Sequence, residues 1–235
     1  MSVPHRVNEI AHTTPPDNDA SGVHEVAAGP LWSVVAEDMR HYAELHYPAG
    51  AGALRRWLLW LHAPGLLVLF VHRVHFRLIR QSPARRNRPA MILFRLLFAL
   101  VRGLRLVVSK SDVAPIAVIG RRVYLSDRGY QILGPRRIGN DTVIHERVVV
   151  GVRAGAHDRP TISANVWIGP DCVIYGDITI GRGATVLPGS VLSMDVPPGA
   201  VVGGNPATFV RDHFDNSALR RSLSTRIDRA WIAAQ

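Results

Sequence analysis

Two short polar segments of this chain combine the residue types that move protons. Ser126 and Asp127 form one segment, and His145 and Glu146 form the other. An imidazole has a pKa near neutrality, so it can take a proton from a hydroxyl group, and a neighbouring carboxylate stabilises the imidazolium that forms. A lone aspartate is a weaker base, because its pKa is near ~4 unless burial raises it. The segments therefore predict general base chemistry if the fold brings them together.

A six-residue repeat is the element that would position these segments. Between Thr161 and Ala207, six bulky aliphatic residues recur six positions apart: Ile162, Ile168, Ile174, Ile180, Val186 and Leu192. A small or β-branched residue follows each of them four positions later: Val166, Cys172, Ile178, Ala184, Ser190 and Val196. This period predicts a parallel β-helix, in which three hexads make one triangular coil and the aliphatic residue points inward. Several coils must stack to bury a core.

Weaker hexads precede the strong ones. Their expected inward residues are Val113, Ile119, Leu125, Ile132, Ile138, Ile144 and Val150. The step from Leu125 to Ile132 is seven residues, which predicts one extra residue at a corner. Leu125 and Ile144 take equivalent places in successive coils, so we expect the two polar segments to stack side by side. Residues 151–161 break the register and are predicted to form a loop outside the prism.

The chain divides into four predicted parts, and its fold class is α+β. Residues 1–28 are polar and predict a disordered tail, and residues 29–110 predict a helical domain with helices near 30–47, 54–61, 66–80 and 90–107. Residues 111–210 predict a left-handed parallel β-helix. Residues 211–235 predict a C-terminal amphipathic helix, with Asn216 or Ser217 as its cap.

The charge of the chain is strongly positive and uneven. The net charge is +10, and seventeen Arg or Lys lie between Arg55 and Arg137 against only Asp112 and Asp127. Such a field favours anionic partners, although a basic surface can also serve solubility alone. No basic motif with interleaved aromatic residues is present, so we expect no nucleic-acid partner.

The compartment and membrane predictions rest on three features. The single cysteine, Cys172, allows no disulfide within the chain, and the N-terminus has no apolar signal core, so we expect a cytoplasmic protein. The apolar run from Trp57 to Val71 is shorter than the ~20 residues that span a bilayer. We expect helices packed on each other or at a subunit interface, with peripheral membrane contact at most as the minority alternative.

The stretch from Trp167 to Ala207 resembles the hexapeptide-repeat acyltransferases. With the helices before it and the interrupted first coils, residues 30 to 210 are similar to the serine acetyltransferase branch, which includes exopolysaccharide O-acetyltransferases. The resemblance implies a left-handed β-helix that forms a homotrimer, or a dimer of trimers, and binds acetyl-CoA between neighbouring prisms without a metal. It also implies direct acyl transfer to a hydroxyl of a small amino acid or sugar. A histidine acts as base, an aspartate orients it, and backbone N–H groups stabilise the oxyanion.

The chain departs from this family where the catalytic histidine is expected. The family has an Asp-His pair after the aliphatic residue of the first coil, and the matching residues here are Ser126 and Asp127. Three replacements for the base stay open: Asp127 itself, His145 oriented by Asp127, and His157 in the loop. His157, Asp158 and Arg159 resemble the family's Asp-Arg-His-Pro segment. We expect four residues to contact the acceptor: Ser126, Glu146, Asp158 and Arg159.

The cofactor side also departs from the family. Two positions that are basic in many relatives are Met194 and Thr208 here, and Arg182 and Arg211 are the expected substitutes. The small residues expected to line the groove remain: Gly169, Gly189, Ser190, Gly203 and Gly204. An acidic carrier-protein thioester is therefore an alternative donor. A further alternative is a member that no longer catalyses and acts as a binding partner.

Overall fold

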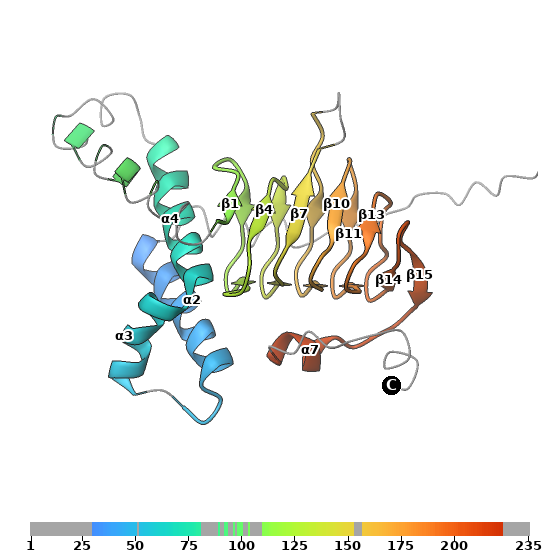
Figure 1. Ribbon diagram of the computed structural model, residues 1–235, viewed down its shortest axis with the longest axis horizontal. Coiled ribbons are helices and arrows are strands. Elements are labelled where there is room, and N and C mark those ends of the chain that lie inside the picture. The colour runs from blue at the N-terminus through green and yellow to red at the C-terminus, as the bar shows by residue number, and fades with distance from the viewer. Residues whose placement is uncertain are drawn as a thin grey trace, which may run out of the picture.

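The computed structural model describes residues 30–50, 52–80, 110–152 and 157–222, with a few single positions between 89 and 103. Figure 1 shows α2 (Leu31–His46), α3 (Ala53–His62) and α4 (Pro64–Ile79) at one end of a long stack of short strands, with α7 (Ser217–Arg221) lying alongside the stack. The stack is the parallel β-helix that the hexads predict. Among the described residues no single helix is long and apolar enough to cross a bilayer. Only α3 and α4 taken together have the length and the apolar composition of a membrane span, and an 83° bend separates them.

The β-helix is a triangular prism with three faces. The first face contains β1 (Asp112–Val113), β4 (Gln131–Leu133), β7 (Val148–Gly151), β10 (Val173–Tyr175) and β13 (Val191–Leu192). The second contains β2 (Val118–Ile119), β5 (Arg137–Ile138), β8 (Thr161–Ile162) and β11 (Thr179–Ile180). The third contains β3 (Tyr124–Leu125), β6 (Val143–Ile144), β9 (Trp167–Ile168), β12 (Thr185–Val186), β14 (Val201–Gly203) and β15 (Thr208–Arg211). Neighbouring strands pair in parallel, except that β15 runs antiparallel to β14.

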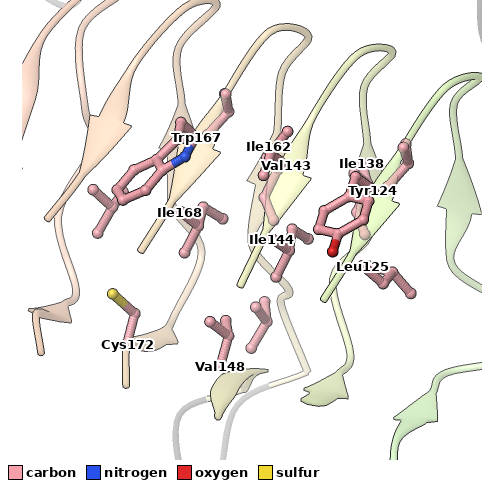
Figure 2. Packing of buried hydrophobic residues seen from close by; sticks show 14 of the residues in the cluster. Tyr124, Leu125, Ile138, Val143, Ile144, Val148, Ile162, Trp167, Ile168 and Cys172 are labelled. Carbon is pink, nitrogen blue, oxygen red and sulfur yellow. The ribbon is translucent and has the colours of Figure 1, made fainter. Parts of the chain in front are cut away.

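The strong hexads have the inward orientation that their spacing predicts. All six aliphatic residues from Ile162 to Leu192 are fully buried. Figure 2 shows Leu125, Ile144 and Ile168 lying on successive strands of the third face. Cys172 is also buried, and burial raises the pKa of its thiol to about 12. Cys172 therefore serves packing in this fold.

One register prediction is wrong. Ile132 was expected to point inward, but its side chain is 50% exposed, and Leu133 is buried in its place. Leu133 pairs with Val113 on one side and with Val150 on the other. The step from Leu125 to the next inward residue is therefore eight positions. The turn 126–130 carries two extra residues at the corner that holds Ser126 and Asp127.

The helical domain packs against the first coils. It consists of α2 (Leu31–His46), α3 (Ala53–His62) and α4 (Pro64–Ile79). Helix α2 begins after Pro30, whose fixed φ suits a helix start, and α4 begins with a proline at its first position. The predicted fourth helix, near 90–107, lies mostly outside the described residues, as does the predicted tail 1–28.

A buried ion pair joins the helices to the prism. Arg73 on α4 lies 3.2 Å from Asp38 on α2 and donates hydrogen bonds to the backbone carbonyls of Ile119 and Gly120. Burial raises the pKa of Asp38, and Arg73 opposes that shift. The guanidinium of α4 thus satisfies a carboxylate of α2 and two carbonyls at the end of β2, which fixes both helices on the second face of the first coil.

The C-terminal segment contacts the turns between the second and third faces. Helix α7 is short, Ser217–Arg221, and the predicted continuation from 223 lies outside the described residues. Asn216 precedes it but does not cap it: its amide donates to the carbonyls of Asn165, Gly183 and Ala184 on the prism. Asp215 accepts the hydrogen bond from the Ser217 backbone instead. Asn216 therefore holds the predicted N-cap position, but its side chain anchors the segment and makes no capping hydrogen bond.

Candidate active site

The two polar segments meet at the edge between the third and first faces, which we call the site edge. Turns 126–130, 145–147, 169–172 and 187–190 stack along it. Leu125 pairs with Ile144 in register, as the hexads predict. Ser126 Oγ donates a 2.9 Å hydrogen bond to Glu146 Oε2, so the polar segments touch.

Asp127 pairs with a histidine of α2 that no sequence motif predicts. His46 Nε2 lies 2.7 Å from Asp127 Oδ2, although the angle at the nitrogen is not that of an in-line hydrogen bond. The other oxygen, Oδ1, accepts the backbone N–H of Gly65 at 3.0 Å, and the Tyr124 hydroxyl lies 3.4 Å from Oδ2. The side chains of His46 and Asp127 are 18% and 11% exposed. The helical domain thus supplies an imidazole where the first coil has none.

Helix α2 positions His46 through Tyr42, one turn earlier. The Tyr42 hydroxyl donates to the Leu125 carbonyl at 2.9 Å and accepts the Leu125 N–H at 2.8 Å. Residues four apart lie on one face of a helix, so this buried clamp also directs His46 toward the turn after β3. The rings of Tyr42 and His46 stack with centroids 6.2 Å apart.

A second histidine lies beside the pair without joining it. His62, at the end of α3, has its ring edge toward His46 with centroids 6.1 Å apart. Its Nε2 forms a 3.1 Å hydrogen bond with the Tyr47 hydroxyl.

Tyr124 also lies beside Asp127, and its pKa is raised by burial first and by Asp127 second. The Tyr124 phenol is therefore neutral and remains a potential donor to Asp127.

His145 occupies a different environment from the one its sequence predicts. Its side chain is 2% exposed, its ring lies on Trp167 with centroids 4.9 Å apart, and its Nδ1 is 3.8 Å from Glu146 Oε2. We expected Asp127 and Glu146 to stabilise the imidazolium, and of these two carboxylates Glu146 does raise the pKa of His145. Burial lowers the pKa of His145 to about 4 despite Glu146, and Asp127 contacts His46 instead. His145 is therefore neutral and a weak base.

The loop residues lie at another edge of the prism. His157, Asp158 and Arg159 connect β7 on the first face to β8 on the second. His157 and Asp158 are exposed, and Asp158 lies 3.4 Å from Arg136 on the same edge. Within one chain the fold does not bring these three residues to Asp127. Residues 153–156 of the loop lie outside the described part of the chain.

The small residues expected to line the cofactor groove do follow the site edge. Gly169 and Gly189 lie in successive turns, and Ser190 Oγ accepts the Gly204 N–H at 3.3 Å, which brings the end of β14 beside them. No side chain closes over Gly189, because a Cβ built there meets nothing within 4 Å. The remaining member, Gly203, ends β14.

The two arginines expected to replace the family's cationic contacts lie elsewhere. Arg182 is exposed in the turn between the second and third faces, and Arg211 ends β15. Neither residue shares the turns of the site edge with the glycines in one chain. Met194 and Thr208, at the positions where many relatives are basic, are neutral. In the described part of the chain, no group of three or more His, Cys, Asp or Glu could hold a metal ion.

No local motif marks His46 in the sequence. It belongs to a helix some eighty positions before Asp127, and only the shared face of Tyr42 and His46 on α2 hints at a polar contact. The arrangement is a histidine beside the Asp127 carboxylate, with Ser126 in the same turn and a second carboxylate, Glu146, in the next coil. Such a group can take a proton from a hydroxyl and return it to a leaving group.

Comparison with known proteins gives a consistent result. A family model described as bacterial transferase hexapeptide (six repeats) matches residues 159–193. The solved structure of soybean serine acetyltransferase complexed with serine is 30% identical, with 79% of this chain and 72% of that chain covered and a TM-score of 0.62. Serine acetyltransferase 4 of Arabidopsis thaliana is 31% identical over 172 residues, 71% of this chain and 45% of that protein.

A relative with another printed acceptor matches the same repeats. Chloramphenicol acetyltransferase of Agrobacterium fabrum is 41% identical over 65 residues, 28% of this chain and 31% of that protein. This chain thus spans less than half the length of these two curated relatives.

Proposed function

Because this chain belongs to the serine acetyltransferase-like family of hexapeptide-repeat acyltransferases, we propose that it transfers an acetyl group from acetyl-CoA to a hydroxyl group of a small acceptor. The observation that carries the proposal is the contact between His46 and Asp127 at the site edge. The acceptor in this proposal is an amino acid or a sugar, and the acceptor assay below has to identify it, because the names printed for the relatives differ in their acceptors.

His46 acts as the general base in this proposal. Its Nε2 faces Asp127, so Nδ1 takes the proton of the acceptor hydroxyl while Asp127 stabilises the imidazolium. The hydroxyl oxygen attacks the thioester carbonyl carbon and forms the ester bond. The carbon–sulfur bond breaks, and the imidazolium returns the proton to the CoA thiolate. Gly65 holds Asp127 in place through its N–H and needs no conformational change to do so.

Ser126 and Glu146 hold the acceptor. Glu146 already accepts from Ser126 Oγ, and its side chain is 11% exposed, so one carboxylate edge can meet an ammonium or hydroxyl group.

The uncovered backbone around Gly189 accommodates the extended arm of CoA. Members of this family are typically trimers. In a trimer, a neighbouring subunit can bring its His157 loop to this edge, and its Arg182 toward the CoA phosphates.

The test is thioester turnover with matched histidine variants. The purified full chain is mixed with acetyl-CoA and a panel of serine and sugar acceptors, and the released CoA thiol is measured. We expect His46→Gln and Asp127→Asn to lower kcat at least a hundredfold, the order of a lost general base. His62→Gln is the control, because it changes a neighbouring histidine that does not touch Asp127, and it should retain most of the activity.

Three results would remove this assignment of the base. Unchanged turnover in His46→Gln would exclude His46 as the general base. A hundredfold loss of turnover in His145→Gln alone, or in His157→Gln alone, would assign the base to that histidine instead. If no acceptor consumes acetyl-CoA, the donor remains to be tested with an acetylated acidic carrier protein, which the neutral Met194 and Thr208 favour.

A further inference from the structure

Helix α3 carries its apolar face on the outside of the molecule. Leu54, Trp57, Leu58 and Leu61 recur at helical spacing and lie on one side of the helix, which we call the α3 face. Their exposed fractions are 75%, 74%, 41% and 83%. Only Leu59 of this helix is buried. An amphipathic helix normally turns its apolar stripe toward the core, so the α3 face requires another apolar surface.

The apolar surface continues from α3 into a hollow between the three helices. The hollow has a volume of about 590 Å³, and its apolar lining includes Trp32, Trp57, Trp60, Leu67 and Phe70. Trp32, at the start of α2, is 70% exposed, and its ring stacks on Phe70 at 6.4 Å. Large contiguous apolar patches on a soluble chain mark a protein or membrane contact.

The charges around this surface distinguish between those two contacts. Arg55 and Arg56 are exposed on α3, Arg56 lines the hollow, and the helix contains no acidic residue. A two-fold contact of the α3 face with itself would bring the arginines of both copies together, because the same patch meets itself. An anionic lipid surface would instead neutralise them and accept the tryptophan and leucine side chains.

Helix α4 differs from α3 in this respect. Most of its apolar residues are buried, among them Leu66, Val68, Leu69 and Val71, and it packs on α2, α3 and the first coil. The 83° bend between α3 and α4 therefore separates a core helix from an exposed one. This geometry lets α3 lie flat on a surface while α4 connects it to the prism.

We propose that α3 is an interfacial helix that seats this chain on an anionic bilayer, with the α3 face in the headgroup region and Arg55 and Arg56 on lipid phosphates. The proposal does not depend on the acetyltransferase reaction. It assigns a membrane surface, rather than a second copy of the chain, to the exposed face.

Vesicle cosedimentation of the full chain tests the proposal. The protein is mixed with vesicles of phosphatidylcholine alone or with about one third phosphatidylglycerol, near physiological salt, where surface charges are screened within ~8 Å. We expect binding to the anionic vesicles. Trp57→Ser/Leu61→Ser keeps the net charge and should weaken binding at least tenfold. Arg55→Gln/Arg56→Gln should lower binding to anionic vesicles by about tenfold or more.

A matched control separates the α3 face from general adsorption of a basic protein. Ile116→Ser removes an aliphatic residue that is 61% exposed on the prism and should bind as the unaltered chain does. Absence of binding to anionic vesicles would overturn the proposal, as would unchanged binding of the Trp57→Ser/Leu61→Ser variant. A smaller oligomer of that variant in sedimentation velocity, with vesicle binding unchanged, would assign the face to a second copy.

Discussion

Buried His145 should make the fold sensitive to mild acid. Burial lowers the pKa of its imidazole to about 4 from its ordinary value of 6.5. The folded chain therefore holds His145 neutral where the unfolded chain would protonate it. The contribution to stability is complete above pH 6.5 and is lost as the pH falls from 6.5 toward 4. Full loss corresponds to about 3 kcal/mol.

The perturbation that tests this is His145→Phe. A phenyl ring can keep the contact with Trp167 without a titrating nitrogen. Urea unfolding of the full chain is followed at pH 7.5 and pH 4.5, at one protein concentration because assembly also contributes. We expect His145→Phe to lose about 2 to 3 kcal/mol less than the unaltered chain between these pH values. Other titrating groups change both proteins equally, so the difference isolates His145.

His157→Phe is the control, because His157 is exposed in its loop. It should leave the pH dependence of unfolding as it is in the unaltered chain. If His145→Phe and the unaltered chain lose the same free energy between pH 7.5 and pH 4.5, His145 is not held neutral by burial. The reasoning that makes it a weak base would then be refuted.

Three further changes test the packing around the site. Gly65→Ala places a Cβ against the Leu125 carbonyl oxygen, so it should destabilise the fold by about 2 kcal/mol or more. Gly52→Ala is the control, because its Cβ meets nothing within 4 Å. Equal melting temperatures of these two variants would contradict the prediction. Arg73→Met leaves the Asp38 carboxylate buried without its ion-pair partner and should lower the free energy of unfolding in urea by about 3 kcal/mol. Adding Asp38→Asn should restore much of this loss, and a double variant as unstable as Arg73→Met would argue against the ion pair. The buried Cys172 thiol should not react with a thiol reagent until the chain unfolds, and rapid labelling of the folded protein would show that the prism opens there.

The prism was predictable because its period is enforced residue by residue. Each aliphatic from Ile162 to Leu192 must point inward from the next face of the prism, so six residues separate successive members and all are buried. The prediction failed where the period itself is broken. Between Leu125 and Leu133 the turn is longer than a hexad, and Ile132 and Leu133 are both aliphatic. Spacing alone cannot say which of two such neighbours faces inward.

The candidate site was only half predictable for a related reason. The register placed the segment Ser126-Asp127 beside His145-Glu146, since stacking within the prism follows from the repeat, and the hydrogen bond between Ser126 and Glu146 fits that placement. The partner of Asp127 comes from α2, and its placement depends on how Tyr42 clamps the helix to β3. No periodicity links those segments. The burial of His145 was likewise hidden, because Trp167 belongs to the next coil.

The central claim is that His46 and Asp127 form one catalytic unit. A double-mutant cycle on kcat for acetyl transfer, with His46→Gln, Asp127→Asn and the combined variant, measures this directly. If the two side chains act together, the combined variant should be no more than a few-fold slower than His46→Gln alone. Losses that multiply in the combined variant, or a His46→Gln enzyme that retains more than about a tenth of the activity, would contradict the account.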